Sequence, residues 1–129
     1  MVYATIIVLL AVVQFQYFGV AVGRARGRHE IKAPAVHGDE HFERFHRAHQ
    51  NTLEQLIAFI PAIYACAYFS YEWLAIAGGV GYVIGRFIYF RSYIADPESR
   101  GPGMIVTMLS TIVMLVAGLL GAVRQAIGM

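Results

Sequence analysis

The sequence predicts an all-α integral membrane protein built as a bundle of four transmembrane helices, and three observations lead to this fold class. Hydrophobic residues make up 58% of the 129 residues and charged residues only 14%, against about 25% charged in an ordinary soluble domain. A soluble globule of this composition would have to expose a largely apolar surface. Two segments are also long and apolar enough to cross a bilayer unaided, and two more lie between them. We expect a single membrane domain, 1–129.

The four helices should cover roughly 3–24, 44–71, 73–95 and 102–125. The first and last contain the clearest spans, 3–22 and 104–123, each about the 20 residues that a crossing needs. No basic segment precedes the first span and no A-x-A-like cleavage site follows it, so we expect a retained helix. The second helix reaches spanning length only if it includes the polar run before it, and Pro61 should kink it. Only Glu72 and its neighbours separate it from the third helix, which contains Arg86, so these two should form a tight antiparallel hairpin.

Charge is concentrated on one side of the predicted bundle. Nine of the ten Lys and Arg residues lie between Arg24 and Arg100, and the connections 23–45 and 96–103 fall on the same side of the membrane. The positive-inside tendency makes that side cytoplasmic, with both termini opposite. Compact ends without a recognisable retention signal favour a bacterial inner membrane over the endoplasmic reticulum. No basic pattern typical of nucleic-acid binding is present.

Several conspicuous residues have structural interpretations. Gly81 and Gly85 have the spacing of a small-residue face for close helix packing, and no strand precedes them as a nucleotide-binding turn would require. Cys66 lies in an apolar setting that favours packing over reactivity. Two histidine pairs have spacings that a metal ion can use, yet their surroundings favour no metal: His37 with His41, and His46 with His49.

The polar run RAHQNTLEQ, 47–55, leads directly into an apolar segment. Arg47, Asn51 and Glu54 are spaced i, i+4 and i+7 and therefore share one narrow face of a helix. The other polar residues of the run lie beside that face or point elsewhere: Gln50 and Gln55 flank it, and His49 points away. A structural interpretation is that Arg47 and Glu54 neutralise each other.

A second polar stripe runs along the third helix, with spacing i, i+4, i+7 and i+11: Tyr82, Arg86, Tyr89 and Tyr93. Its structural interpretation is an interfacial aromatic belt. Ionisable groups in membrane helices are costly and normally face an interior, a cavity or an interface. Two such faces at one depth supply more polar groups than packing requires, and we interpret them as a ligand site.

The ligand that suits these groups is a small anion with carboxylates and an amine, because arginine binds carboxylates and Glu54 can bind the amine. Arg100 precedes the fourth helix, and Pro102 suits the first turn of that helix. Arg100 thus lies beside the partial positive charge of a helix N-terminus. Such a place stabilises an anion, including a thiolate, whose parent thiol has a pKa near 8.5.

The combination of RAHQNTLE, a proline-containing apolar run, GRFIYFRSY and DPESRG resembles the MAPEG superfamily of integral membrane glutathione-dependent proteins. The nearest branch is the microsomal glutathione transferase 3 type, with the leukotriene-forming synthases and the type 2 enzymes close by. The resemblance runs from QYF near residue 17 to the fourth helix. It implies a homotrimer that binds glutathione between neighbouring protomers at the cytoplasmic end.

The resemblance also implies roles for individual residues. Arg100 matches the catalytic arginine that stabilises the thiolate. The glutathione-binding residues of the family match Arg26, Arg47, Asn51, Glu54, Arg86, Tyr89 and Tyr93. Three neighbours of the motif are weaker candidates: His49, Gln50 and Gln55. Gly27 stands where the leukotriene-forming synthases have a second arginine, Gln55 replaces their tyrosine, and His49 replaces a glutamine as in the type 3 pattern.

The function expected from these residues is that of a membrane-bound glutathione transferase with glutathione peroxidase activity, acting in detoxification. Glutathione is the co-substrate, no metal is required, and a hydrophobic electrophile or lipid hydroperoxide arrives through the membrane lipid. A non-catalytic lipid-presenting scaffold and a glutathione-dependent lipid isomerase remain as alternatives. A channel or transporter fits less well, because the polar residues gather at one end and do not line a path.

Overall fold

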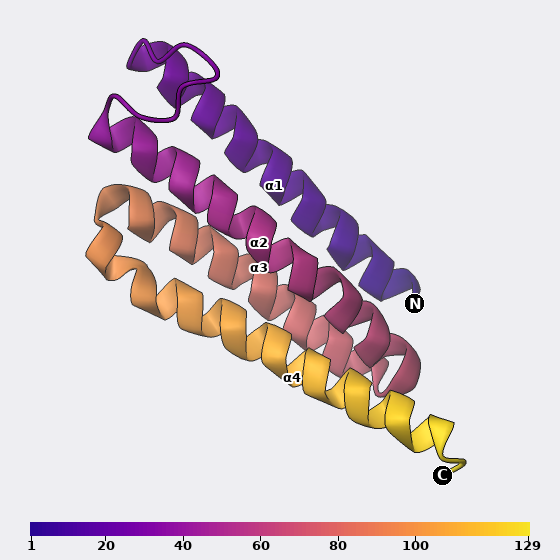
Figure 1. The fold of residues 1–129 in the computed structure, drawn as a ribbon. Coiled ribbons are helices and arrows are strands. Elements are labelled where there is room, and N and C mark those ends of the chain that lie inside the picture. Colours follow the sequence, from indigo (N-terminus) through magenta and orange to yellow (C-terminus); the bar gives the residue numbers. More distant parts are fainter.

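The computed structural model describes residues 1–129 as a bundle of four long helices. These are α1 (Val2–Arg28), α2 (Glu40–Phe69), α3 (Glu72–Ala95) and α4 (Gly101–Ala126), with a short 3-10 helix, η1 (Pro97–Arg100), before α4. The helices run side by side, with both termini at one end and the α1–α2 connection and η1 at the other (Figure 1). All four are long and apolar enough to cross a membrane. The predicted all-α membrane bundle is confirmed.

The ends of the helices differ from the sequence-based expectation, and local chemistry explains why. α1 continues beyond residue 24 to Arg28, and its last turn is basic, which suits the negative end of a helix. α2 begins at Glu40 because the Asp39 side chain accepts a hydrogen bond from the backbone N–H of Phe42 at 2.9 Å and caps the helix. This hydrogen bond holds the pKa of Asp39 below its usual range. His41, expected in a connection, is therefore helical.

The 96–103 segment, expected as a loop, is also mostly helical. The Asp96 side chain accepts a hydrogen bond from the backbone N–H of Glu98 at 3.1 Å and starts η1. Ser99 Oγ donates to the carbonyl oxygen of Ser92 at 2.9 Å, which ties η1 back to α3. Pro102 lies in the first turn of α4, where its missing N–H costs no hydrogen bond. The chain thus passes from α3 to α4 without a flexible connection.

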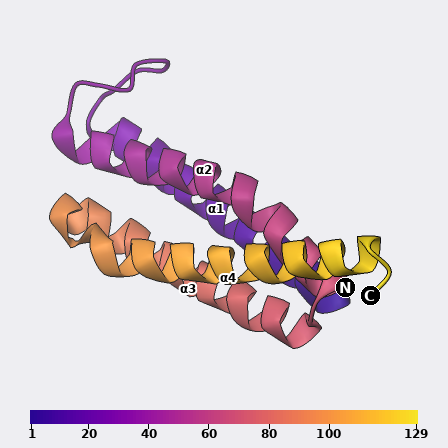
Figure 2. The same ribbon diagram turned by 60° about the horizontal axis from the view of Figure 1, so that its bottom comes forward.

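Small residues bring α3 and α4 into close contact, as the Gly81–Gly85 spacing predicted. A Cβ atom added to Gly85 would lie 2.9 Å from the backbone nitrogen of Thr107, and one added to Gly81 would meet Ser110. Gly103 of α4 likewise lets the backbone of α3 come close, because an added Cβ would lie 2.6 Å from Tyr89 Cα. In the view of Figure 2, α1 and α2 form one layer and α3 and α4 the other.

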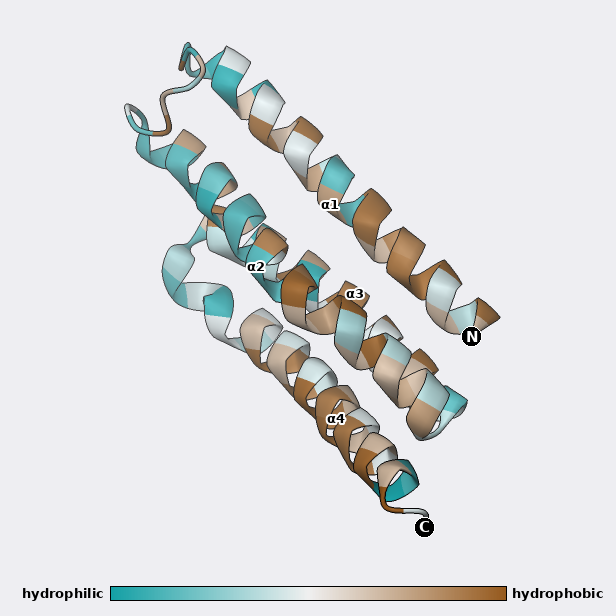
Figure 3. Cartoon of the chain, turned by 45° about the vertical axis from the view of Figure 1, so that its right-hand side comes forward, coloured by the Kyte–Doolittle hydropathy of each residue, from teal (hydrophilic) through white to brown (hydrophobic).

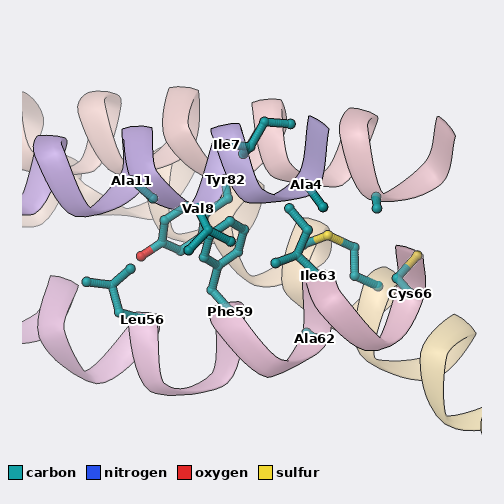
Figure 4. Close-up of a cluster of buried hydrophobic side chains, with 12 residues drawn as sticks. Ala4, Ile7, Val8, Ala11, Leu56, Phe59, Ala62, Ile63, Cys66 and Tyr82 are labelled. Carbon is teal, nitrogen blue, oxygen red and sulfur yellow. The ribbon is translucent and has the colours of Figure 1, made fainter. Parts of the chain in front are cut away.

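The main hydrophobic core gathers side chains from all four helices, most of them from the facing sides of α1 and α2 (Figure 4). Phe59 of α2 stacks on Tyr82 of α3 with 3.8 Å between ring centroids. Cys66 is fully buried in this cluster, as expected for a packing residue. Pro61 lies inside α2, which continues through it to Phe69. The outer faces of the helices carry many exposed apolar side chains, and polar residues gather on α2 towards the α1–α2 connection (Figure 3).

Candidate functional site

A pocket of about 240 Å³ lies at the polar end of the bundle, between the first turns of α2, the end of α3 and η1. Three residues predicted from distant parts of the sequence meet in it: Arg47, Tyr93 and Arg100. The other lining residues are Glu40, Glu43, Arg44 and Pro97. The polar faces that helical spacing assigned to α2 and α3 therefore meet beside the arginine that precedes α4.

Arg100 is the charged residue of this pocket that has the fewest partners within the chain. It is the last residue of η1 and the residue before α4, so its position is fixed by the two helices that meet there. Its side chain is exposed, and its only hydrogen bond is a long one of 3.5 Å from Nη1 to the carbonyl oxygen of Pro97. It takes no part in the ion pairs of the chain. An anion in the pocket would meet an unpaired guanidinium and the N-terminus of α4 together.

The other charges of the pocket are partly neutralised. Arg44 Nη2 contacts Glu40 Oε1 at 3.2 Å. Glu43 Oε1 contacts His37 at 3.1 Å and lies 4.0 Å from Arg47 Nη2. The side chain of Arg47 is still 65% exposed, and such a solvated pair contributes little to stability. Arg47 is thus free to bind a ligand at small cost.

Glu54 is exposed and has no polar partner within the chain. The interpretation in which Arg47 and Glu54 neutralise each other does not hold in this structure, since the nearest carboxylate to Arg47 is Glu43. Gln50 is exposed on the same surface, and Gln55 is half-buried beside it. The α2 face predicted from spacing is therefore present and open.

The tyrosine stripe of α3 faces the interior of the bundle. The exposed fractions of Tyr82, Tyr89 and Tyr93 are 0%, 4% and 8%, whereas the side chains of an interfacial belt would be exposed. Tyr89 and Tyr93 stack with 5.6 Å between ring centroids, and Tyr93 reaches the pocket. Tyr82 lies deeper, in the hydrophobic core.

Arg86 is fully buried and acts through its neighbours. Its Nη2 donates to Asn51 Oδ1 at 2.8 Å and to Thr52 Oγ1 at 2.9 Å, and its guanidinium lies 4.3 Å from the centroid of the Tyr89 ring. Because Asn51 Oδ1 is occupied by Arg86, the amide NH₂ of Asn51 remains to donate to a ligand. In this chain Arg86 is a positioning residue that orients Asn51 and supports Tyr89.

Thr52 is the residue of this network that the sequence analysis missed. It is fully buried, and its hydroxyl donates to the carbonyl oxygen of Ala48 at 2.9 Å while it accepts from Arg86. Buried threonines in helices commonly bond to the carbonyl four residues earlier. Spacing alone therefore gave no sign that this one also holds an arginine from another helix.

Of the predicted residues, only Arg47, Tyr93 and Arg100 line the pocket itself, and Arg26 and His49 have their contacts on α1 and the α1–α2 connection. Arg26 donates to the carbonyl oxygens of Ala35 at 2.7 Å and of Ile31 at 3.4 Å, so it fixes the α1–α2 connection. His49 stacks on Phe15 of α1 with 4.3 Å between ring centroids. Its direction away from the Arg47 face agrees with the helical spacing.

His37 and His41, one of the histidine pairs considered for a metal ion, contact other residues. His41 contacts His29 at 3.1 Å, and His37 contacts Glu43. The structure contains no group of three or more His, Cys, Asp or Glu side chains placed to hold a metal ion. The charged groups that line the pocket are the guanidinium groups of Arg44, Arg47 and Arg100 and the carboxylates of Glu40 and Glu43.

Comparison with known proteins gives consistent matches over most of the chain. A model of the MAPEG family matches residues 3–120. The chain is 33% identical over 120 residues to an uncharacterized protein of Synechocystis, which covers 93% of this chain and 88% of that protein. It is 37% identical over 112 residues to microsomal glutathione S-transferase 2 of Mus musculus, with coverage of 83% and 76%. Leukotriene C4 synthase of Cavia porcellus is 31% identical over 94 residues, with coverage of 73% and 63%. The type 3 branch stays a prediction, since the named transferase among these is of type 2.

Proposed function

The chain belongs to the MAPEG family, and we propose that it is a membrane-bound glutathione transferase. It conjugates glutathione to hydrophobic electrophiles or uses it to reduce lipid hydroperoxides. The observation that carries this proposal is the convergence of Arg47, Tyr93 and an unpaired Arg100 on one pocket at the end of a membrane bundle. The type 2 glutathione transferases among its relatives support the same chemistry.

Each polar group has a task in this proposal. Arg47 and the amide NH₂ of Asn51 hold glutathione carboxylates, and Glu54 holds the amine. Arg86 keeps Asn51 and Tyr89 in place from behind. The thiol lies towards Arg100 and the N-terminus of α4, where positive charge favours the thiolate. Catalysis then consists of orientation and electrostatic stabilisation of the nucleophile.

The thiolate effect can be given a magnitude. An ordinary thiol with a pKa near 8.5 is only about 3% ionised at pH 7. Lowering that pKa to about 6.5 makes the thiolate the major form. It requires the site to stabilise the thiolate over the thiol by about 2.7 kcal/mol. The thiolate then attacks the electrophilic carbon and the leaving group departs with the bonding electrons. With a hydroperoxide, two glutathiones give the disulfide, an alcohol and water.

We further propose that the site is completed in a homotrimer. In one chain Arg26 lies apart from the pocket, whereas a site at a protomer boundary lets Arg26 of one protomer serve the glutathione of the next. The open polar face of α2, with Glu54 and Gln50 exposed, also needs a cover within a membrane, because unpaired polar groups in lipid are costly. Both connections face the cytoplasm, and a bacterial inner membrane is the proposed location.

The direct test is turnover of a chromogenic aryl halide with glutathione by purified protein, together with calorimetry of glutathione binding. Arg100→Ala should retain binding and lose most of the rate, while Arg124→Ala, at the far end of α4, serves as the matched control. Glutathione binding with an unchanged rate in Arg100→Ala would overturn the thiolate role. No glutathione binding at all would favour a lipid-presenting scaffold, and a rearranged lipid product without conjugation would favour an isomerase.

Trimer formation has its own test. Arg26→Ala and Arg100→Ala protomers should each be weakly active alone, and co-expressed mixtures should regain activity if Arg26 acts across a boundary. Native mass spectrometry gives the number of protomers directly. A monomer that binds glutathione with full affinity would refute the shared site.

A further inference from the structure

A second groove, larger than the pocket just described, lies between α1 and α3 with α2 at its back. Its volume is about 480 Å³, within the usual size of ligand sites, roughly 300–1,000 Å³. It shares only Arg44 with the pocket at Arg100. The proposed transferase chemistry makes no use of it.

The walls of the groove are aromatic and already packed against one another. Phe18 of α1 stacks on Phe90 of α3 with 3.9 Å between ring centroids, and Phe87 meets Phe18 edge-on at 6.0 Å. Phe45 of α2 contacts Phe90 edge-on at 6.0 Å. Tyr17 and Phe87 are about half exposed or more, at 59% and 45%. An apolar chain can therefore enter from the lipid side onto a preformed surface.

The groove carries two arginines and no carboxylate. Arg91 is exposed and has no hydrogen-bond or ion-pair partner in the chain. Arg44 is held firmly, because its Nη1 donates to the carbonyl oxygens of Ile94 and Ala95 at 3.2 and 3.3 Å and its Nη2 pairs with Glu40 Oε1, outside the groove, at 3.2 Å. The Arg44 guanidinium is thus fixed against the end of α3, and the exposed Arg91 is the unpaired charge of the groove.

The positive charge extends into a neighbouring hollow that shares Tyr17, Ala21 and Phe45 with the groove. That hollow adds Arg24 and Arg28 and again no carboxylate. The guanidinium of Arg28 lies 5.6 Å from the centroid of the Phe45 ring. Aromatic walls therefore lie beside four arginines, and this combination suits one kind of occupant.

We propose that the α1–α3 groove binds an anionic membrane phospholipid, with the phosphate at Arg91 beside Arg44 and an acyl chain along the exposed rings of Tyr17 and Phe87, which the buried Phe18 and Phe90 support from behind. The charge of the lining is complementary to a phosphodiester, and basic pockets between membrane helices are typical sites for acidic headgroups. Arginine binds phosphate oxygens through two parallel hydrogen bonds. A free anion would gain nothing from the aromatic walls, whereas a phospholipid uses both parts. The proposal is independent of the glutathione chemistry.

The test measures thermal unfolding of the full-length protein in neutral detergent. Phosphatidylglycerol should raise the unfolding temperature saturably, and phosphatidylcholine should do so much less. Arg91→Gln should raise the half-saturating concentration of phosphatidylglycerol about tenfold, as expected for loss of one charge-assisted contact. Arg124→Gln, an exposed arginine at the other end of the bundle, should leave it unchanged. Equal effects of the two lipids, or of the two variants, would overturn the proposal.

Two further experiments distinguish a phospholipid in the groove from a free anion or a covering protein. Glycerol phosphate without acyl chains should give no shift, and a full shift would mean a free anion as the ligand. In a Trp73→Phe, Phe87→Trp protein, brominated phosphatidylglycerol should quench the new tryptophan at lower concentrations than brominated phosphatidylcholine, and Arg91→Gln should remove that difference. This readout does not depend on stability. A tryptophan that neither lipid quenches would mean that protein covers the groove, and the proposal would fail.

Discussion

Gly103 should control the geometry of the pocket, although it bears no functional group. It lies in the first turn of α4, three residues after Arg100, and it is buried against the backbone of Tyr89 on α3. A Cβ atom at this position would lie 2.6 Å from Tyr89 Cα and closer still to the Tyr89 backbone nitrogen. Backbone atoms in a helix cannot rotate away as a side chain can. In Gly103→Ala, α4 must therefore retreat from α3.

The required movement follows from the contact distance. An ordinary contact of at least 3.4 Å demands a separation greater by roughly 0.8 Å at Tyr89 Cα and by slightly more at the Tyr89 nitrogen. Overpacking of this kind costs about 1–3 kcal/mol of stability. The same shift carries Arg100 away from Tyr93, and misplacement of catalytic groups by about 1 Å can cost on the order of 100-fold in rate. We expect kcat/KM for the aryl halide to fall between about tenfold and 100-fold.

Gly101→Ala is the matched control. Gly101 is two residues earlier in the chain, has the right-handed helical conformation, and has no atom within 4 Å of an added Cβ. It should keep its activity and gain slightly in stability, because alanine is the better helix former. Rates are measured on detergent-solubilised protein at temperatures where circular dichroism shows both variants folded. Equal kcat/KM for the two variants would refute the view that the α3–α4 contact sets the pocket.

Three further predictions concern single side chains. Arg86→Lys keeps the charge but loses the planar guanidinium, whose Nη2 bonds both Asn51 and Thr52 and whose plane lies over the Tyr89 ring, so the affinity for glutathione measured by calorimetry should fall about tenfold. In Arg100→Ala, the midpoint of the pH–rate profile should rise by about two pH units with activity recovering near pH 9, which a misfolded protein would not do. The pKa of Asp39 is lowered on folding from 3.8, so its carboxylate stabilises the protein above that pH and this contribution is lost as the pH falls through the folded value. Asp39→Asn retains a capping side chain and should show a smaller loss of thermal stability between about pH 6 and about pH 3.

Helical spacing was sufficient to predict the two polar faces. Arg47 on α2 and Tyr93 on α3 each belong to a set repeated at i, i+4 and i+7, and a helix places such sets on one face whatever surrounds it. The four apolar spans follow equally directly from length and composition. The helix faces and the apolar spans depend only on residues close together in the sequence, so spacing, length and composition are enough to predict them.

Spacing could not decide what each face meets. The stripe containing Arg86 suits an interfacial belt and a buried network equally well, and only the packing of α2 against α3 distinguishes them. The ends of α1 and α2 were misjudged for a related reason. A polar segment such as 24–28 or 40–43 can be solvated loop or helix, and the choice depends on a cap at Asp39 and on the helix-end charges.

Arg86 and Glu54 illustrate two ways in which a membrane bundle can hold a charge. Arg86 is fully buried, and partners from α2 together with a tyrosine ring support its guanidinium. Glu54 lies on the α2 surface with no partner in its own chain, a costly place for a carboxylate if lipid covers it. The cost disappears when a ligand amine and a neighbouring protomer cover that surface together. On this reasoning, the residue that looks most unfavourable in the single chain supports the proposed glutathione site and the proposed protomer boundary at the same surface.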